Sequence, residues 1–229
     1  MLATKPDLIL WILSPTDIGE TSNLVREEHR ALPATGAGKG GSIHGLANSA
    51  CAFLASEARN QSTGSLLRIV LYQIRTLYVR NYLMRGRDSD FLRMSPNPQW
   101  AVSLKQFESY ADEIEGKAKL AGVPVVSVLL PNRAQAAMLG MGNWPEESDP
   151  YKLDNDLRTI IRKHGGIYVD ILPYFRAIPD AETYYYPIDG HPDAPGHVLI
   201  TRMLVDAFSQ SPIAEFHPAA ERASAVKGN

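Results

Sequence analysis

Residues 184–197 read Tyr-Tyr-Tyr-Pro-Ile-Asp-Gly-His-Pro-Asp-Ala-Pro-Gly-His, and a helical apolar pattern follows them. Within this stretch Asp189 and His191 stand two residues apart, in a turn rich in proline and glycine. A histidine held by an acid is the usual general base that activates a hydroxyl nucleophile. From about Pro195 the apolar residues recur at helical spacing, namely Val198, Leu199, Met203, Leu204 and Phe208. The stretch therefore predicts a carboxylate and an imidazole fixed at the start of a helix.

The same spacing has a plainer interpretation. Asp189 also suits a turn, because aspartate side chains bond to nearby backbone groups there. His191 would then be a surface side chain, and His197 would pack against a neighbouring element. The spacing by itself leaves both interpretations open.

Three continuous apolar runs predict strands that are buried on both faces, as in a parallel sheet. They lie at residues 8–13, 123–130 and 167–171. Helical patterns separate and follow the runs, and they cover residues 47–58, 65–84, 100–120, 151–164 and 195–208. This order of elements predicts an α/β fold with a parallel sheet.

Several of these stretches resemble SGNH/GDSL hydrolases. Residues 184–197 resemble the last conserved block of that family, residues 5–13 the strand before its Gly-x-Asn-Asp block, and residues 122–131 the strand that follows. The resemblance implies a flavodoxin-like three-layer sandwich with a parallel sheet. It also implies a Ser-His-Asp triad that cleaves or transfers acyl esters.

The resemblance assigns roles to particular residues. His191 matches the base of the triad, and Asp189 matches the acid that orients it, although only Gly190 separates them where two residues are commonest. The segment Ser14-Pro15-Thr16-Asp17 stands in place of the Gly-x-Asn-Asp block. Thr16 occupies the position of the asparagine that helps to bind the oxyanion. Ser14, Thr16 and Asp17 are therefore predicted to bind the oxyanion or the substrate.

The nucleophile of the family has no counterpart, because no Gly-Asp-Ser occurs in the sequence. The nearest stretch, residues 87–90 (Arg-Asp-Ser-Asp), follows a helical pattern and lacks the glycine. A triad without a nucleophile cannot perform covalent catalysis. We expect either the C-terminal part of a longer hydrolase, with its N-terminal strands missing, or a non-catalytic relative, and favour the first. Ser14, at the end of a predicted strand, is the alternative nucleophile within the chain.

The function implied is that of an ester hydrolase acting on acyl, above all O-acetyl, esters, to which this chain supplies His191 and Asp189. A polysaccharide O-acetyltransferase of the same fold and a non-catalytic carbohydrate-binding relative are the alternatives. The expected partner is a small-molecule or carbohydrate ester. The resemblance implies no metal and no organic cofactor.

Length, charge and composition limit the domain organisation and the kinds of partner. The 229 residues suit one domain, which we assign to residues 1–210 with an insertion at about 20–98, followed by a flexible tail at 211–229. A net charge of −2 gives no electrostatic case for nucleic acid. No apolar run approaches the roughly 18 residues that a membrane span needs. No signal peptide is visible, so the compartment stays undetermined, and an extracytoplasmic one remains open if the N-terminus is truncated.

Other candidate sites are better explained as structure. Gly36, Gly38 and Gly41 fit a dinucleotide-binding spacing, yet no strand precedes them and no acid follows at the required distance, so we predict a loop containing His44. Cys51 is the single cysteine and lies in an apolar run, which predicts a packing role.

Three polar residues lie at or just after the ends of predicted strands. Arg133 and Gln135 come after the second strand, where they would either touch the substrate or lie on the surface. Asp170 is predicted to be a structural acid at the end of the third strand.

Overall fold

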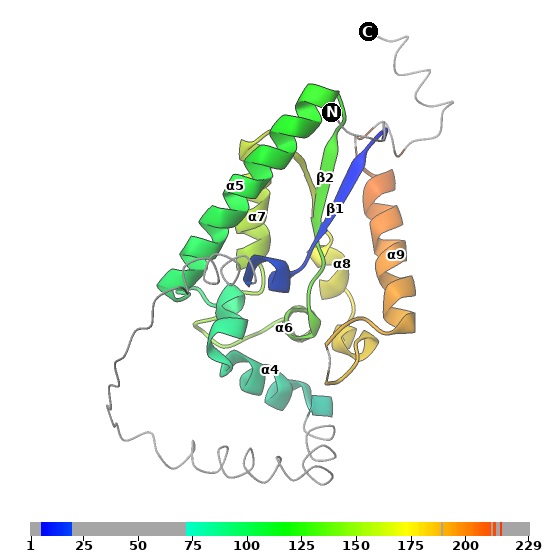
Figure 1. The fold of residues 1–229 in the computed structure, drawn as a ribbon. Helices are drawn as coiled ribbons and strands as arrows, with labels where there is room; N and C mark the ends of the chain where they lie inside the picture. Colours follow the sequence, from blue (N-terminus) through cyan, green and yellow to red (C-terminus); the bar gives the residue numbers. More distant parts are fainter. Residues whose placement is uncertain (1–5, 20–71, 189, 212, 214–215, 217–229) are drawn as a thin grey trace.

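The computed structural model describes residues 6–19, 72–188, 190–211, 213 and 216. These residues form a parallel three-stranded sheet in the order β1-β2-β3, made of β1 (Ile9–Leu13), β2 (Val125–Leu129) and β3 (Ile167–Val169). Figure 1 shows the sheet with helices packed around it. The predicted α/β class with a parallel sheet is confirmed. The third strand ends sooner than predicted, because Asp170 and Ile171 lead directly into a helix.

The described helical elements are α4 (Arg75–Leu83), η1 (Gly86–Leu92), α5 (Pro98–Ala121), α6 (Arg133–Met141), α7 (Lys152–Lys163), α8 (Leu172–Arg176), η2 (Ala181–Tyr184) and α9 (Ala194–Ser209). Of these, α5, α7 and α9 match predicted helices, and α4 matches the last part of one. A further helix begins at Pro15 and is described to residue 19. None of the described helices is both long and apolar enough to cross a lipid bilayer.

Some predictions concern residues outside the described ranges. These are the glycine-rich loop, His44, Cys51, the helix at 47–58, the first part of the helix at 65–84, Asp189 and most of the tail. Within the described part of the predicted 65–84 helix, Ile74 interrupts the helical backbone just before α4.

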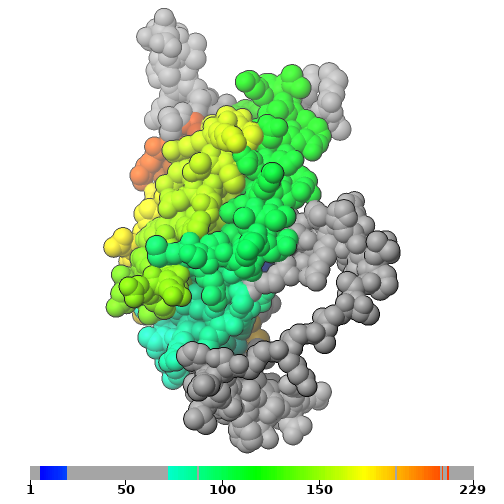
Figure 2. Space-filling view, turned by 90° about the vertical axis from the view of Figure 1, so that its left-hand side faces the viewer, coloured from blue at the N-terminus to red at the C-terminus, as the bar shows by residue number. Residues whose placement is uncertain are grey.

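Two apolar clusters cover the two faces of the sheet. On one face, α5 and α7 pack Phe107, Leu157 and Ile161 against the strands. On the other face, α8 and α9 contribute Phe175 and Met203. Figure 2 views the molecule from the side of α5 and α7, which lie next to each other along its surface. The sheet is therefore the middle layer between two layers of helices.

The strands differ in how completely they are covered. All five residues of β2 are buried, as expected for the central strand of a parallel sheet. In β1, however, the side chains of Leu10 and Ile12 are 39% and 46% exposed. Among the described residues β1 pairs with β2 alone, so its other edge carries no strand. An apolar strand with an uncovered edge and face is uncommon in this class of fold.

The turn before α9 is fixed by close contacts. Asp193 is the N-cap of α9, and its Oδ1 accepts a hydrogen bond of 2.8 Å from the backbone N–H of Gly196. Gly196 lies so near the preceding segment that a Cβ atom there would be 2.1 Å from the carbonyl oxygen of Tyr184. The helix can hold this position only with glycine at residue 196.

We therefore expect Gly196→Ala to destabilise the protein by about 1–3 kcal/mol, since a backbone carbonyl cannot move aside without shifting its segment. Gly116→Ala is the matched control, because Gly116 is also helical and a Cβ atom added there would meet nothing within 4 Å. This control should be neutral or stabilising by about 0.5–1 kcal/mol. Urea unfolding of both variants measures the difference, and equal effects would contradict the close approach.

Candidate functional site

A pocket of about 610 Å³ lies at the carboxyl ends of β1 and β2. This edge is where open α/β sheets bind their ligands. The segments that line the pocket come from four parts of the chain, namely the start of the helix after β1, residues 130–133 after β2, the region from α4 to the second turn of α5, and the turn before α9. The pocket therefore gathers segments that are far apart in the sequence.

His191 enters the pocket from a hairpin-like turn. The backbone N–H of Tyr186 donates to the carbonyl of His191 at 2.8 Å, and the N–H of Gly190 donates to the carbonyl of Tyr186 at 2.9 Å. Gly190 has a φ of +83°, a conformation that glycine adopts without steric cost. The His191 side chain is exposed and lines the pocket. Asp189, its predicted partner, lies outside the described residues.

Ser14 and Asp17 form the cap of the helix that begins at Pro15. The Asp17 carboxylate accepts from the backbone N–H of Ser14 at 2.7 Å and from its hydroxyl at 2.9 Å. The Ser14 hydroxyl is also 2.7 Å from the hydroxyl of Thr16. Proline at the first helical position and an acid at the third resemble a capping box. Asp17 thus holds the helix start.

The structure brings three of the five predicted site residues together. Ser14, Thr16 and His191 line the same pocket, whereas Asp17 is not among the residues that line it. No cluster of three or more histidine, cysteine, aspartate or glutamate residues suited to a metal ion occurs in the described part of the chain.

An aromatic wall borders the pocket beside α4. Tyr78, Tyr82, Phe91 and Trp100 follow one another with ring centroids 6.2, 6.4 and 6.3 Å apart. The Tyr82 hydroxyl accepts from the Asn132 amide at 2.9 Å. Burial raises the pKa of Tyr82 to about 12 and also raises the pKa of Tyr78. Both hydroxyls are therefore neutral at pH 7.

Arg133 and Gln135 are both buried, which excludes the surface position, one of the two alternatives for them. The Gln135 amide donates to the carbonyl of Pro150 at 2.7 Å, a structural contact. Arg133 lines the pocket and donates to the carbonyl oxygens of Pro187 at 2.8 Å and Tyr72 at 2.6 Å. It thereby ties the His191 turn to the start of α6 and to the segment before α4.

Sequence reasoning missed three residues that line the pocket, Tyr82, Arg85 and Asn132. Asn132 carried a usable signal, since an asparagine directly after a predicted strand suits a helix N-cap, and its side chain accepts a hydrogen bond from the backbone N–H of Gln135 at 3.0 Å.

Comparisons of the chain with protein-family models, with curated proteins and with solved structures found no match.

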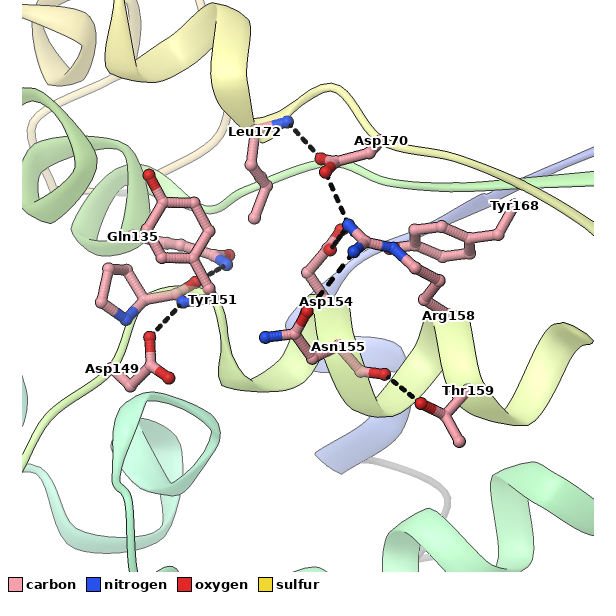
Figure 3. Close-up of polar contacts among 11 residues, drawn as sticks. Gln135, Asp149, Tyr151, Asp154, Asn155, Arg158, Thr159, Tyr168, Asp170 and Leu172 are labelled. Carbon is pink, nitrogen blue, oxygen red and sulfur yellow. Dashed lines mark hydrogen bonds and ion pairs between the residues drawn. The ribbon is translucent and has the colours of Figure 1, made fainter. Parts of the chain in front are cut away.

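A second polar cluster joins α7 to the end of β3 and is shown in Figure 3. Arg158 donates to the carboxylates of both Asp154 and Asp170, and Tyr168 donates to Asp154 at 2.6 Å. The other oxygen of Asp170 accepts from the backbone N–H of Leu172 at 3.0 Å. Asp170 therefore has the structural role that its position at the strand end predicted.

The pKa of Asp154 provides a test of this cluster. Burial raises its pKa from 3.8 to about 6, against the opposing effect of the Tyr168 hydrogen bond. Because the folded state binds this proton more tightly than the unfolded state, the stability contributed by Asp154 is complete below about pH 4 and is lost as the pH rises through about 6.

We expect the free energy of unfolding of the unaltered protein to fall relative to that of Asp154→Asn between about pH 4 and 6. Chemical unfolding at several pH values measures this difference. Asp156→Asn, a partly exposed residue of the same helix that pairs with Lys152, is the control for charge removal. A constant difference between Asp154→Asn and the unaltered protein would contradict the prediction.

Proposed function

We propose that the protein is an SGNH-type hydrolase of acyl esters, with His191 as general base and Asp189 as the acid that orients it. One observation carries the proposal: His191 lines the same pocket as Ser14 and Thr16, at the carboxyl edge of a parallel sheet. The alternation of strands and helices and the covering of both sheet faces agree with the flavodoxin-like architecture that the resemblance implies.

The chemistry follows from the role of a histidine base. His191 accepts the proton of an attacking hydroxyl while its oxygen bonds to the acyl carbon, and it returns the proton to the departing alcohol. A water molecule then repeats the sequence, which releases the acid and restores the hydroxyl. Thr16 lines the same pocket and is the proposed donor toward the developing oxyanion, for which its hydroxyl turns away from that of Ser14.

The attacking hydroxyl needs a source. The Ser14 hydroxyl donates to Asp17 and contacts Thr16, so it is already engaged as part of a helix cap. We propose instead that a further strand pairs with the uncovered edge of β1 and carries the nucleophile at its carboxyl end. The exposure of Leu10 and Ile12 supports this, because an additional strand and its connection would cover such apolar side chains.

An acyltransferase is the second candidate. The pocket has the volume of a small-molecule site and an aromatic wall that suits a sugar ring. A sugar hydroxyl in the place of water would then receive the acyl group, so that the same base yields an O-acetylated carbohydrate.

The first experiment is hydrolysis of p-nitrophenyl acetate by the protein, both as this sequence and as a form extended upstream of residue 1. We expect His191→Ala to lower kcat/KM about 100-fold or more in whichever form is active, since a general base contributes that much. His197→Ala is the matched control, because His197 is an exposed histidine of α9 that does not line the pocket. Equal loss in both variants, or none in either, would contradict the assignment.

Ser14→Ala distinguishes the two sources of the hydroxyl. If Ser14 is only a helix cap, its replacement should lower the free energy of unfolding by about 1 kcal/mol and leave the esterase activity intact. If Ser14 is the nucleophile, its replacement should abolish the activity. Unfolding and activity measured on the same preparation separate these outcomes, and loss of all turnover would refute the proposed additional strand as the source of the nucleophile.

A further inference from the structure

Two arginines line the pocket without an acidic partner among the described residues. Arg133 is only 4% exposed, and the partners of its guanidinium are the carbonyl oxygens of Tyr72, Glu182 and Pro187. Arg85 is exposed and donates to the Tyr72 hydroxyl at 2.7 Å. Neither arginine forms an ion pair with any described carboxylate. A buried guanidinium without a counter-charge is unusual, because the desolvation of its charge is not offset by an anion.

The two cations belong to one wall of the pocket. The Cζ atom of Arg133 lies 4.0 Å from the centroid of the Tyr78 ring, and the Cζ atom of Arg85 lies 5.2 Å from that of the Tyr82 ring. These two rings are neighbours, with centroids 6.2 Å apart. Both tyrosine hydroxyls are neutral at pH 7, so they do not supply the missing negative charge. The rings stabilise both cations without neutralising them.

The described acids that line the pocket, Asp88 and Asp90, do not supply that charge either. Asp90 is buried, pairs with Arg93 at 3.7 Å and accepts from the Asn97 amide. Asp88 is exposed and lies beyond ion-pair distance of both pocket arginines, as no salt bridge joins them. Among the described lining residues, two guanidinium groups (Arg85 and Arg133) and one carboxylate (Asp88) thus have no ion-pair partner, so the balance of unpaired charge is positive.

We infer that the pocket binds an ester whose alcohol or acyl part carries a carboxylate or a phosphate group. Arg85 is the contacting cation, and Arg133 is the second, buried charge that favours the anion. Planar guanidinium groups suit both anions, because they donate two parallel hydrogen bonds to a pair of oxygens. The inference deepens the proposed function by naming its substrate class, but the binding itself does not depend on hydrolysis.

Calorimetric titration with glucose, glucuronate and glucose 6-phosphate tests the inference. The three probes share one ring and differ at C6, so differences among them measure the neutral, carboxylate and phosphate groups. We expect at least one of the two anions to bind about tenfold or more tightly than glucose, and its affinity to weaken as sodium chloride is added. The stronger of the two identifies the anion.

Variants assign the anion to its residues. Arg85→Gln should remove the preference over glucose, and Arg85→Lys should restore part of it, since charge returns without the planar fork. Arg80→Gln is the matched control, because Arg80 is an exposed arginine of α4 that does not line the pocket. Arg133→Met should also lower the preference if circular dichroism shows it folded. If it does not fold, the Arg85 variants decide.

Three results would overturn the inference: equal affinity for all three probes, no binding of either anion, or a preference that persists in Arg85→Gln. The outcome is separate from that of the esterase assay. A protein that prefers the anion but hydrolyses no ester would refute the proposed function and leave the anion site. An active esterase without this preference would refute the anion site and leave the proposed function.

Discussion

Parallel pairing of β1 with β2 and of β2 with β3 is the constraint on which the rest of the molecule depends. Strands that run in one direction all end at the same edge, so the segments after β1 and β2 meet there. The helix at Pro15 and the residues before α6 are thereby brought together, although more than a hundred residues separate them. The pocket is a consequence of this pairing, and the residues directly after each strand supply part of its lining.

Arg133 links that edge to the turn that carries His191. Its three carbonyl partners belong to segments before α4, in η2 and in the turn itself. A guanidinium can satisfy several carbonyls at once because its donors are fixed in one plane. The same side chain brings a charge into the pocket that no described acid neutralises. Arg133 therefore contributes both to the position of the His191 turn and to the positive charge of the pocket.

The sequence predicts those elements of the fold whose apolar residues follow a clear run or a helical repeat. Apolar runs indicated all three strands, and amphipathic patterns indicated α5, α7 and α9. It did not predict α6, because this helix is buried on nearly every side and shows no polar face. That Ser14, Thr16 and His191 lie near the carboxyl edge of the sheet could be expected, because each lies in or directly after a recognisable stretch, and all three line the pocket; their roles stay predictions. Arg85 and Tyr82 could not, since only tertiary packing brings α4 to the pocket.

The uncovered edge of β1 and the engaged hydroxyl of Ser14 bear on the same question. A parallel strand added to that edge would run alongside β1 and end beside Ser14, since its carboxyl end must lie at the same edge of the sheet. It would also cover part of the apolar surface of Leu10 and Ile12, which favours its pairing by roughly 25 cal/mol per Å² of area removed from water. A serine at the end of such a strand would reach the pocket from the side of Ser14, with His191 already lining it. Completing the sheet and supplying the nucleophile would then be one structural event.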